Sequence, residues 1–490
     1  MNKYCLILAF CLLSVHTISA QDWIKLIEDI QSKSANQVLT LPNGDLILAG
    51  QVNDPGDYYL LSGLLVRTDP SGNLIWQKRV GSTSPDGAYV KNERFDDITL
   101  TTDGYLVAVG SRSPNQANAY QKSDVLVAKF DLDGNEIWRE YFDWGATDNG
   151  LGVAALPNGE VVVCGSTNSF NSGNFDGFLL KLNTSGVLEW RTSFDVDNSD
   201  NWLYDVVFTS DQQLLAVGSV QLPTVGNRVF AIKANLDGNE LWSQTYSYYA
   251  IRGNSIVENK NGHFGIAGMG YDDESAGFDN LILEIDEAGN EVWGEDYIAS
   301  GATAVMGELF NVLPCAEGGY TAVGMSGANG FDGYYILRVD ADGDRVIDSS
   351  YFDGAPYTEF ATGLTWASDG GLVVTGGRVK PGGDYDLILT HFSNFGCTQS
   401  SVTATEELVQ VEVSASPNPA NDFILVDVGK IPTGPYAFCI FDASGKLMLN
   451  TLSGQAQFSV SCQALPSGTY FYTLQLENRR VSRGQFLVQH

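Results

Sequence analysis

The sequence has few histidines, cysteines and basic residues, and these shortages exclude several classes of function. Of its 490 residues, four are histidine and seven are cysteine, while 27 lysines and arginines face 59 aspartates and glutamates. The resulting net charge of −32 repels phosphate backbones, so a nucleic acid is not an expected partner. HExxH zinc motifs, phosphate loops and nucleophile elbows are also missing. The composition offers catalysis little support, although the many carboxylates leave an acid–base pair open.

Long apolar runs are missing as well, except for one near the N-terminus. Lys3 precedes an apolar run over residues 4–15, and Ala20 closes a short segment of small residues. This order is typical of a secretory signal peptide, and we expect it to be cleaved after Ala20. No other stretch approaches the roughly 20 apolar residues that a membrane-spanning helix needs. The sequence therefore predicts an exported mature chain without a transmembrane helix.

Removal of residues 1–20 would leave an odd number of cysteines, five, so at least one has no partner within the chain. Cys439 and Cys462 share the C-terminal segment and are the predicted disulfide in an oxidising compartment. Cys164 belongs to the apolar run VVVCG and is expected to be a small buried side chain.

Glycine, by contrast, is abundant, with 53 residues, and one pattern recurs along the chain. An apolar run, a tight Asp/Asn/Gly turn and a second run ending on tryptophan predict a β-hairpin. These hairpins end at Trp76, Trp138, Trp190, Trp242 and Trp293. A second hairpin lies between them, and its second strand ends on a glycine: Gly50, Gly110, Gly165, Gly218, Gly268, Gly324 and Gly376. Four strands per repeat of about 50 residues predict one propeller blade each.

The repeat count predicts how the ring closes. Seven glycine-ending strands occur, but the sixth repeat has Ile347 in place of tryptophan, and the seventh runs out near Gly396 without a fourth strand. Trp23 precedes Gly50 by 27 residues, which is also the spacing from Trp138 to Gly165. We therefore predict an all-β, seven-bladed propeller over residues 21–396, closed by the N-terminal strand, which removes the free blade edges.

The tryptophan hairpins resemble the blades of propellers related to the pyrroloquinoline quinone enzymes. In that family an Asp–Gly turn before tryptophan docks one blade on the next, which implies a structural role for these tryptophans. The threonine–glycine form of the turn is missing here and seven units replace eight, so we expect no bound quinone. A repeated basic residue is expected to pair with acidic turn residues, at Arg67, Lys129, Lys181, Lys233 and Arg338.

The last part of the chain is different. Residues 397–413 have no blade pattern and read as a linker, and residues 414–490 alternate short strands with turns, which predicts a small β-sandwich. This segment resembles the type A C-terminal sorting domain of the type IX secretion system of Bacteroidetes-type bacteria. The matching motif residues are Pro417, Asn418, Pro419, Gly445, Leu465, Pro466, Gly468 and Tyr470. The resemblance implies the type IX machinery as a partner, transit through the periplasm, and surface attachment or release.

The long connections should all emerge on one rim of the propeller, because both hairpin turns of each blade are tight. Variable loops on a rigid scaffold are where binding residues usually lie. The candidate ligand-binding residues are Tyr58, Tyr59, Tyr89, Arg94, Arg112, Tyr120, Trp144, Trp202, Arg252 and Tyr357. They suit a glycan or protein ligand, while the alternative is that these loops only pack on one another. A second hypothesis is a polysaccharide hydrolase or lyase at the mouth of the central channel.

One turn also suggests Ca²⁺. Asp340, Asp342, Asp344 and Asp348 place oxygens at positions 1, 3, 5 and 9 of a loop, but Tyr351 stands where a calcium loop has its glutamate. The related turns elsewhere read as ordinary hairpin turns, in which Asp, Asn and Gly serve the backbone. Apart from this possible Ca²⁺, no cofactor is predicted.

Overall fold

The structure is a computed structural model. It describes residues 23–27, 32–54, 57–81, 92–113, 122–170, 173–246, 250–272, 277–298, 306–327, 334–351, 358–379, 384–393, 395, 413–416, 420–428, 436–441, 447–453, 455, 457–463, 465–476 and 479–489. The chain divides into two compact units, residues 1–400 and 401–490. The predicted signal peptide and the predicted linker as far as residue 412 lie outside the described residues. Where the chain is described, no helix is long and apolar enough to cross a membrane.

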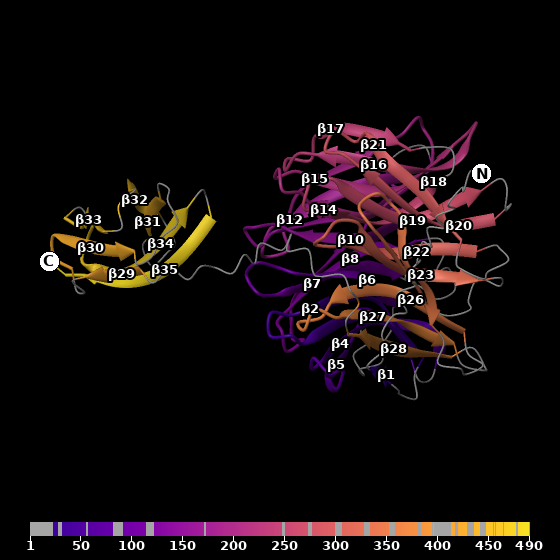
Figure 1. Ribbon diagram of the computed structural model, residues 1–490, viewed down its shortest axis with the longest axis horizontal. Helices are drawn as coiled ribbons and strands as arrows, with labels where there is room; N and C mark the ends of the chain where they lie inside the picture. Colours follow the sequence, from indigo (N-terminus) through magenta and orange to yellow (C-terminus); the bar gives the residue numbers. More distant parts are fainter. Residues whose placement is uncertain are drawn as a thin grey trace, which may run out of the picture. The chain divides into compact units, whose positions relative to one another are not determined.

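The first unit is a propeller of seven four-stranded antiparallel blades (Figure 1). Blades 1 to 3 are, from the inner to the outer strand, β2 (Lys33–Thr40), β3 (Leu46–Asp54), β4 (Asp57–Thr68), β5 (Leu74–Val80); β6 (Asn92–Leu100), β7 (Leu106–Ser113), β8 (Asp124–Phe130), β9 (Glu136–Phe142); β10 (Asp148–Ala155), β11 (Val161–Thr167), β12 (Asp176–Leu182), β13 (Leu188–Phe194). Blades 4 and 5 are β14 (Asn201–Phe208), β15 (Leu214–Leu222), β16 (Gly226–Ala234), β17 (Glu240–Thr245); β18 (Ala250–Glu258), β19 (Phe264–Asp272), β20 (Gly277–Ile285), β21 (Glu291–Tyr297). Blades 6 and 7 are β22 (Met306–Pro314), β23 (Tyr320–Gly327), β24 (Tyr334–Val339), β25 (Arg345–Tyr351); β26 (Thr358–Trp366), β27 (Leu372–Val379), β28 (Tyr385–Phe392), β1 (Trp23–Ile27). The predicted seven-bladed fold is confirmed.

Blade 7 is built from both ends of the propeller. Its outer strand, β1, pairs antiparallel with β28, and Trp23 lies opposite His391 (Figure 1). The two rings stack with their centroids 5.4 Å apart. Closure by the N-terminal strand is therefore confirmed, and it joins residues that are more than 360 positions apart in the sequence.

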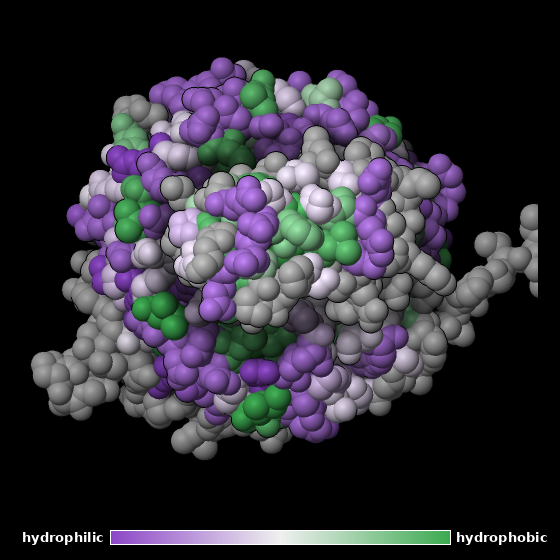
Figure 2. Space-filling view, turned by 90° about the vertical axis from the view of Figure 1, so that its left-hand side faces the viewer, coloured by the Kyte–Doolittle hydropathy of each residue, from purple (hydrophilic) through white to green (hydrophobic). Residues whose placement is uncertain are grey.

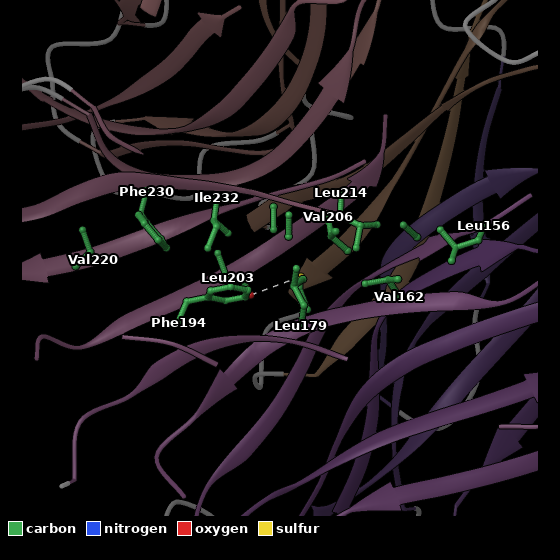
Figure 3. Packing of buried hydrophobic residues seen from close by; sticks show 14 residues of the cluster. Leu156, Val162, Leu179, Phe194, Leu203, Val206, Leu214, Val220, Phe230 and Ile232 are labelled. Carbon is green, nitrogen blue, oxygen red and sulfur yellow. Dashed lines mark hydrogen bonds between the residues drawn. The ribbon is translucent and has the colours of Figure 1, made fainter. Parts of the chain in front are cut away.

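The core lies between neighbouring blades. Between blades 3 and 4, Leu179 of β12 meets Leu203 of β14 and Phe230 of β16, and all three are at most 1% exposed (Figure 3). Each large apolar side chain buried in this way contributes about 1.5–3 kcal/mol to folding. Since every blade has such an interface on both sides, the stability of each blade depends on its neighbours.

The predicted end of each second strand at its repeated glycine is wrong, because the strand continues past it, as β7 does beyond Gly110. The glycine instead lets two backbones approach closely. A Cβ atom on Gly110 would lie 1.9 Å from the carbonyl oxygen of Arg94, and one on Gly218 would lie 1.8 Å from that of Trp202. In both blades the inner strand has a register shift beside this glycine. A bulge brings the inner backbone toward its partner strand, and only glycine leaves room for it.

The tryptophans dock one blade on the next, as the resemblance implied. Gly186, in the outer turn of blade 3, has a φ of +81°, and a Cβ there would lie 2.9 Å from the ring of Trp138 in blade 2. The Trp138 Nε1–H donates to the carbonyl oxygen of Thr184 at 3.1 Å. Trp190 makes the same bond to Leu236 at 2.9 Å. These tryptophans are structural.

The repeated basic residues pair with acidic turn residues. Their shortest contacts are Arg67–Asp45 at 2.6 Å, Lys129–Asp103 at 2.8 Å, Lys181–Glu160 at 2.6 Å and Lys233–Asp211 at 2.7 Å, together with Arg338–Glu317. Blade 5 has the pair reversed, because Glu284 stands at the basic position and contacts His263 at 2.8 Å. Each pair joins the two hairpins of one blade.

The second unit contains two small sheets. One has the order β29-β30-β33 and the other the order β32-β31-β34-β35. Their bounds are β29 (Val413–Ser416), β30 (Phe423–Val428), β31 (Tyr436–Phe441), β32 (Leu447–Ser453), β33 (Gln457–Ser461), β34 (Gly468–Leu476) and β35 (Arg479–Val488). Ile424 and Phe438 pack together with Phe486 in its core. Leu465 is buried there too, and the hydroxyl of Tyr470 donates to the carbonyl oxygen of Pro466 at 2.9 Å. Pro417, Asn418, Pro419 and Gly445 lie outside the described residues.

The predicted Cys439–Cys462 disulfide is wrong. Cys462 is a free, buried thiol in the core of the second unit, and Cys164 is also free. The strand before Cys462, β33, belongs to a different sheet from β31, on which Cys439 lies. Cys315, in the propeller, is disulfide-bonded instead.

We expect Cys397 to be the partner of Cys315. Phe395, two positions before Cys397 in the sequence, packs in the same core cluster as Cys315. Peptide mapping without reduction should join the two cysteines, and Cys315→Ser should lower the free energy of unfolding by about 2–4 kcal/mol. A reducing agent should have no further effect on that variant. A crosslink from Cys315 to Cys439, or a free Cys315, would contradict this expectation.

Candidate functional site

The two rims of the propeller differ. Turns within hairpins, such as residues 41–45 and 69–73, all lie on one rim because the strands alternate in direction. The opposite rim carries the starts of the inner strands and the connections between hairpins and between blades. We call it the long-loop rim. Seen from one side, the described surface is mostly hydrophilic, with hydrophobic residues in small separate groups (Figure 2).

Half of the predicted ligand-binding residues can be placed with their side chains. Tyr89, Tyr120 and Tyr357 lie outside the described residues, and only the backbone of Tyr58 and Tyr59 is described, at the start of β4. The five that can be placed all lie on or near the long-loop rim: Arg94, Arg112, Trp144, Trp202 and Arg252.

Arg252 lies in a cluster formed by three neighbouring blades. Its Nη1 is 3.0 Å from Oε1 of Glu308 in blade 6, and Asn254 Nδ2 donates to the same oxygen at 2.9 Å. The guanidinium also lies 5.5 Å from the ring centre of Tyr204 in blade 4. The side chain of Arg252 is 40% exposed and that of Glu308 only 10%. Arg252 is therefore held in place by Glu308 and still has exposed side-chain surface that a ligand could contact.

The arginines of blade 2 are more engaged. Arg94 pairs with Asp96 at 3.0 Å, and the charge of that carboxylate raises the pKa of Arg94. Arg112 contacts Asp124 at 2.6 Å and lies 3.7 Å from the ring centre of Tyr141. Arg112 thus links strands of one blade, because its charge is paired with Asp124 and the face of its guanidinium lies over the ring of Tyr141.

The two predicted tryptophans have different surroundings. Trp144 packs against Phe170 and Phe178, each with its ring centre 5.1 Å away, and the guanidinium of Arg191 lies 4.8 Å from its ring. Trp144 thus packs on the connection after β11 and on strands β12 and β13 of blade 3. Trp202 meets Phe175 at 5.9 Å and is only partly buried.

Phe175 belongs to a repeated aromatic position that the sequence analysis missed. The repeated glycine of each second strand pairs with a residue of the third strand. Three positions before that partner, blade 3 has Phe175, blade 5 has Phe278 and blade 7 has Tyr385. Phe278 and Tyr385 are each 38% exposed. The signal was present as an aromatic residue at the start of the third strand in alternate repeats. We call these three residues the rim aromatics.

Two carboxyl groups of the inner strands bridge blades. Asp97 Oδ2 accepts the N–H of Val153 in blade 3 at 2.8 Å, and Asp205 Oδ2 accepts the N–H of Ile256 in blade 5 at 2.9 Å. Burial raises the pKa of Asp97 to about 7, with a further contribution from the charge of Asp205. Burial also raises the pKa of Asp205 to about 6. Their backbone partners give both groups a structural role.

The effect of Asp205→Asn on stability should depend on pH. The folded protein holds the Asp205 proton up to about pH 6, whereas the unfolded chain releases it near pH 4. Since the folded state binds more protons in this window, the contribution of Asp205 to stability falls as pH rises through it. The free energy of unfolding of Asp205→Asn, compared with that of the wild type, should therefore rise by roughly 1–3 kcal/mol between pH 4 and pH 7. Urea unfolding across this range measures the difference, and a constant difference would contradict the expectation.

The predicted calcium loop does not gather its carboxylates. Asp340 Oδ1 accepts the backbone N–H groups of Asp342 at 3.0 Å and Asp344 at 2.9 Å, and Asp348 pairs with Arg345 at 3.0 Å. Within the described ranges no three His, Cys, Asp or Glu residues are grouped so that they could hold a metal ion. The turn is an ordinary hairpin turn in which the first aspartate serves the backbone.

The likeness of this chain to solved structures is distant. Chaetomium thermophilum Raptor is 10% identical with a TM-score of 0.46, over 75% of this chain and 29% of that one. A Trypanosoma rangeli sialidase in complex with 2,3-difluorosialic acid is 10% identical with a TM-score of 0.39, over 83% and 86%. The β-propeller domain of the Trilobed protease from Pyrococcus furiosus is 8% identical with a TM-score of 0.42, over 76% and 98%. At such values the likeness carries no argument about activity.

A comparison with curated protein sequences finds no match. Residues 414–489, however, match the family described as a secretion system C-terminal sorting domain. The match covers the whole of the segment for which the type IX resemblance was stated, and a sorting domain implies export. The chain is thus an exported seven-bladed β-propeller with a C-terminal sorting domain of the type IX secretion system.

Proposed function

We propose that the protein is a surface-attached or released binding module whose long-loop rim recognises an extracellular glycan. The observation that carries the proposal is the repeated aromatic position, which places partly exposed rings on three blades of one rim. Aromatic rings offer large contact area to the apolar faces of a ligand. Arg252 and Glu308 add charged hydrogen-bonding groups on the same rim. A protein ligand is the alternative to a glycan and would use the same features.

A hydrolase or lyase receives less support from the described residues. A glycosidase needs a carboxyl group with a raised pKa beside its substrate. Among the described residues of the propeller, burial raises the pKa of three carboxyls, those of Asp97, Asp205 and Asp148. Backbone N–H groups of another blade hold Asp97 and Asp205. Asp148 accepts the N–H of Trp144 at 3.0 Å and the hydroxyl of Ser169 at 2.8 Å. The rim carboxylates Asp96, Asp124 and Glu308 are paired with arginines. These arrangements favour recognition over catalysis.

Binding and product release should be measured together on the full-length protein. Pull-down with insoluble polysaccharides and a glycan array should reveal binding without new reducing ends or unsaturated products. Replacing all three rim aromatics with alanine should weaken binding at least about tenfold, because each stacked ring contributes about 1 kcal/mol. Ile137→Ala, which truncates a 52% exposed side chain on an outer strand, serves as the control. Product release would make the protein an enzyme, and binding unaffected by the triple variant would place the ligand elsewhere.

A further inference from the structure

A cavity of about 300 Å³ opens at the junction of blades 7 and 1, which lie together in Figure 1. It is on the long-loop rim, because it is lined by the start of the inner strand β2, the end of β3 and the start of β28. The lining residues that matter here are Ser32, Lys33, Gln51, Asn53, Asp384 and Tyr385. One rim aromatic therefore borders a hollow whose other walls are polar except for Leu61.

Tyr385 is held in place by both blades. Its backbone N–H donates to Oγ of Ser32 in the segment leading into blade 1 at 2.8 Å. Its ring lies almost perpendicular to that of Phe360 in blade 7, at 76° and with the centres 6.0 Å apart. The side chain nevertheless remains 38% exposed. A ring fixed before binding loses little conformational freedom when a ligand stacks on it.

The polar residues of the cavity fit a ligand rich in hydroxyl groups. The amides of Gln51 and Asn53 provide both donors and acceptors, as does the hydroxyl of Ser32. Lys33 and Asp384 add one positive and one negative charge, so the cavity itself has no net charge that would select an ion. Lys33 Nζ also donates to Gln77 Oε1 at 3.1 Å, which limits its movement.

A pyranose ring matches this combination, because one face of it presents C–H groups and its edge presents hydroxyls. Pockets of this size commonly combine an apolar surface with a few placed polar groups. The net charge of −32 repels anionic polymers, which favours a neutral sugar. We infer that this cavity is the subsite for one neutral sugar residue, with Tyr385 as its stacking platform. The inference rests on the proposed function and gives it a ligand class and a position.

The chain offers a matched comparison between two rim aromatics. Phe278 occupies the same position in blade 5 as Tyr385 does in blade 7, and both are 38% exposed. Phe278 contacts Tyr271, with ring centres 5.8 Å apart, and is not part of the cavity wall. Loss of either ring removes the same kind of surface, but only the loss of Tyr385 removes the platform of the cavity.

The test uses the full-length protein and immobilised mannan, xylan, mixed-linkage β-glucan and, as an anionic comparison, polygalacturonate. A neutral trisaccharide from the polymer that binds is then titrated calorimetrically. Tyr385→Ala should weaken trisaccharide binding about tenfold, as expected for one aromatic contact. Tyr385→Phe, which keeps the ring, and Ile137→Ala, which truncates an exposed side chain on an outer strand, should bind within about twofold of the wild type. Phe278→Ala, which removes a rim aromatic outside the cavity, should weaken trisaccharide binding clearly less than Tyr385→Ala. Melting temperatures establish that each variant is folded, and Gln51→Ala, expected to weaken binding severalfold, provides a second variant of the cavity.

The outcomes separate the two proposals. If the polymer binds but Tyr385→Ala and Gln51→Ala match the wild type, the subsite is overturned and the binding function stands. Equal losses for Tyr385→Ala and Phe278→Ala would overturn it too, because the site would then be spread over the rim. If the protein binds polygalacturonate and none of the neutral polymers, the inference of a neutral sugar is overturned. Failure of the wild type to bind any glycan, in array or pull-down, overturns both.

Discussion

Gly218→Ala is expected to lower the free energy of unfolding by at least about 4 kcal/mol, which is exceptional for a change of one methyl group. The added Cβ would lie 1.8 Å from the carbonyl oxygen of Trp202 and 2.9 Å from the Cα of Leu203. Both atoms belong to the backbone of β14, so no side-chain rotation relieves the overlap. The two strands must separate, which breaks the pairing of Leu203 with Gly218. Urea unfolding followed by tryptophan fluorescence measures the loss.

Gly294→Ala is the control for this effect. Gly294 lies on the outer strand β21, and its nearest atom would be Cδ1 of Leu283 at 3.2 Å, the flexible end of a side chain. We expect a change within about 1 kcal/mol there, because reduced freedom of the unfolded chain offsets a slight contact. A loss of less than 1 kcal/mol for Gly218→Ala would show that β14 and β15 lie further apart than described.

Deletion of β1 is expected to open the ring. Ile27 is buried, and Trp23 partly buried, in the core between blades 7 and 1, while Leu26 packs, partly buried, on the core between blades 6 and 7. Full burial of such a side chain contributes about 1.5–3 kcal/mol, so their removal costs up to roughly 5–9 kcal/mol, comparable with the entire stability of many domains. It also leaves β28 as an unpaired edge. Limited proteolysis should cut first in blade 7, and the melting transition should broaden or be lost.

Lys25→Ala provides the matched control, because Lys25 lies on the same strand and its ammonium donates to Asn73 at the surface, at 3.1 Å. An exposed contact of this kind contributes little, so we expect a change within about 0.5 kcal/mol. If the protein without β1 unfolded with the same midpoint and cooperativity as the wild type, the N-terminal strand would not be the closure.

The blade count and the closure were predictable because both depend on local patterns that repeat. The tryptophan in each outer strand, the glycine in each second strand and the equal spacing of Trp23 and Trp138 from the next such glycine are sequence features. Seven copies of a unit that cannot bury its faces alone must stack, and a missing outer strand can come only from the other terminus. The sorting domain was recognisable for a similar reason, since its motifs follow one another along the chain.

The candidate site was less predictable. Trp144 was selected for its size and its place in a loop, yet Phe170, Phe178 and Arg191 surround it. The sequence could not show that packing, because those residues come from three other parts of blade 3, namely the connection after β11 and the strands β12 and β13. Tyr385 was missed because an aromatic residue at the start of a strand reads as part of the strand. Only its position against Ser32, more than 350 residues away, places it beside a cavity.

The sequence alone determined the repeat, the number of blades, the terminal closure and the sorting domain, since each follows from residue spacing and strand period. Only the tertiary structure decided which carboxylates are paired, which cysteine is bonded and which aromatic ring borders a cavity. Those properties depend on contacts between blades, and blades meet through side chains that are distant in the sequence. The physical reason is that propeller blades are locally encoded, whereas their interfaces and rims are assembled from several blades at once.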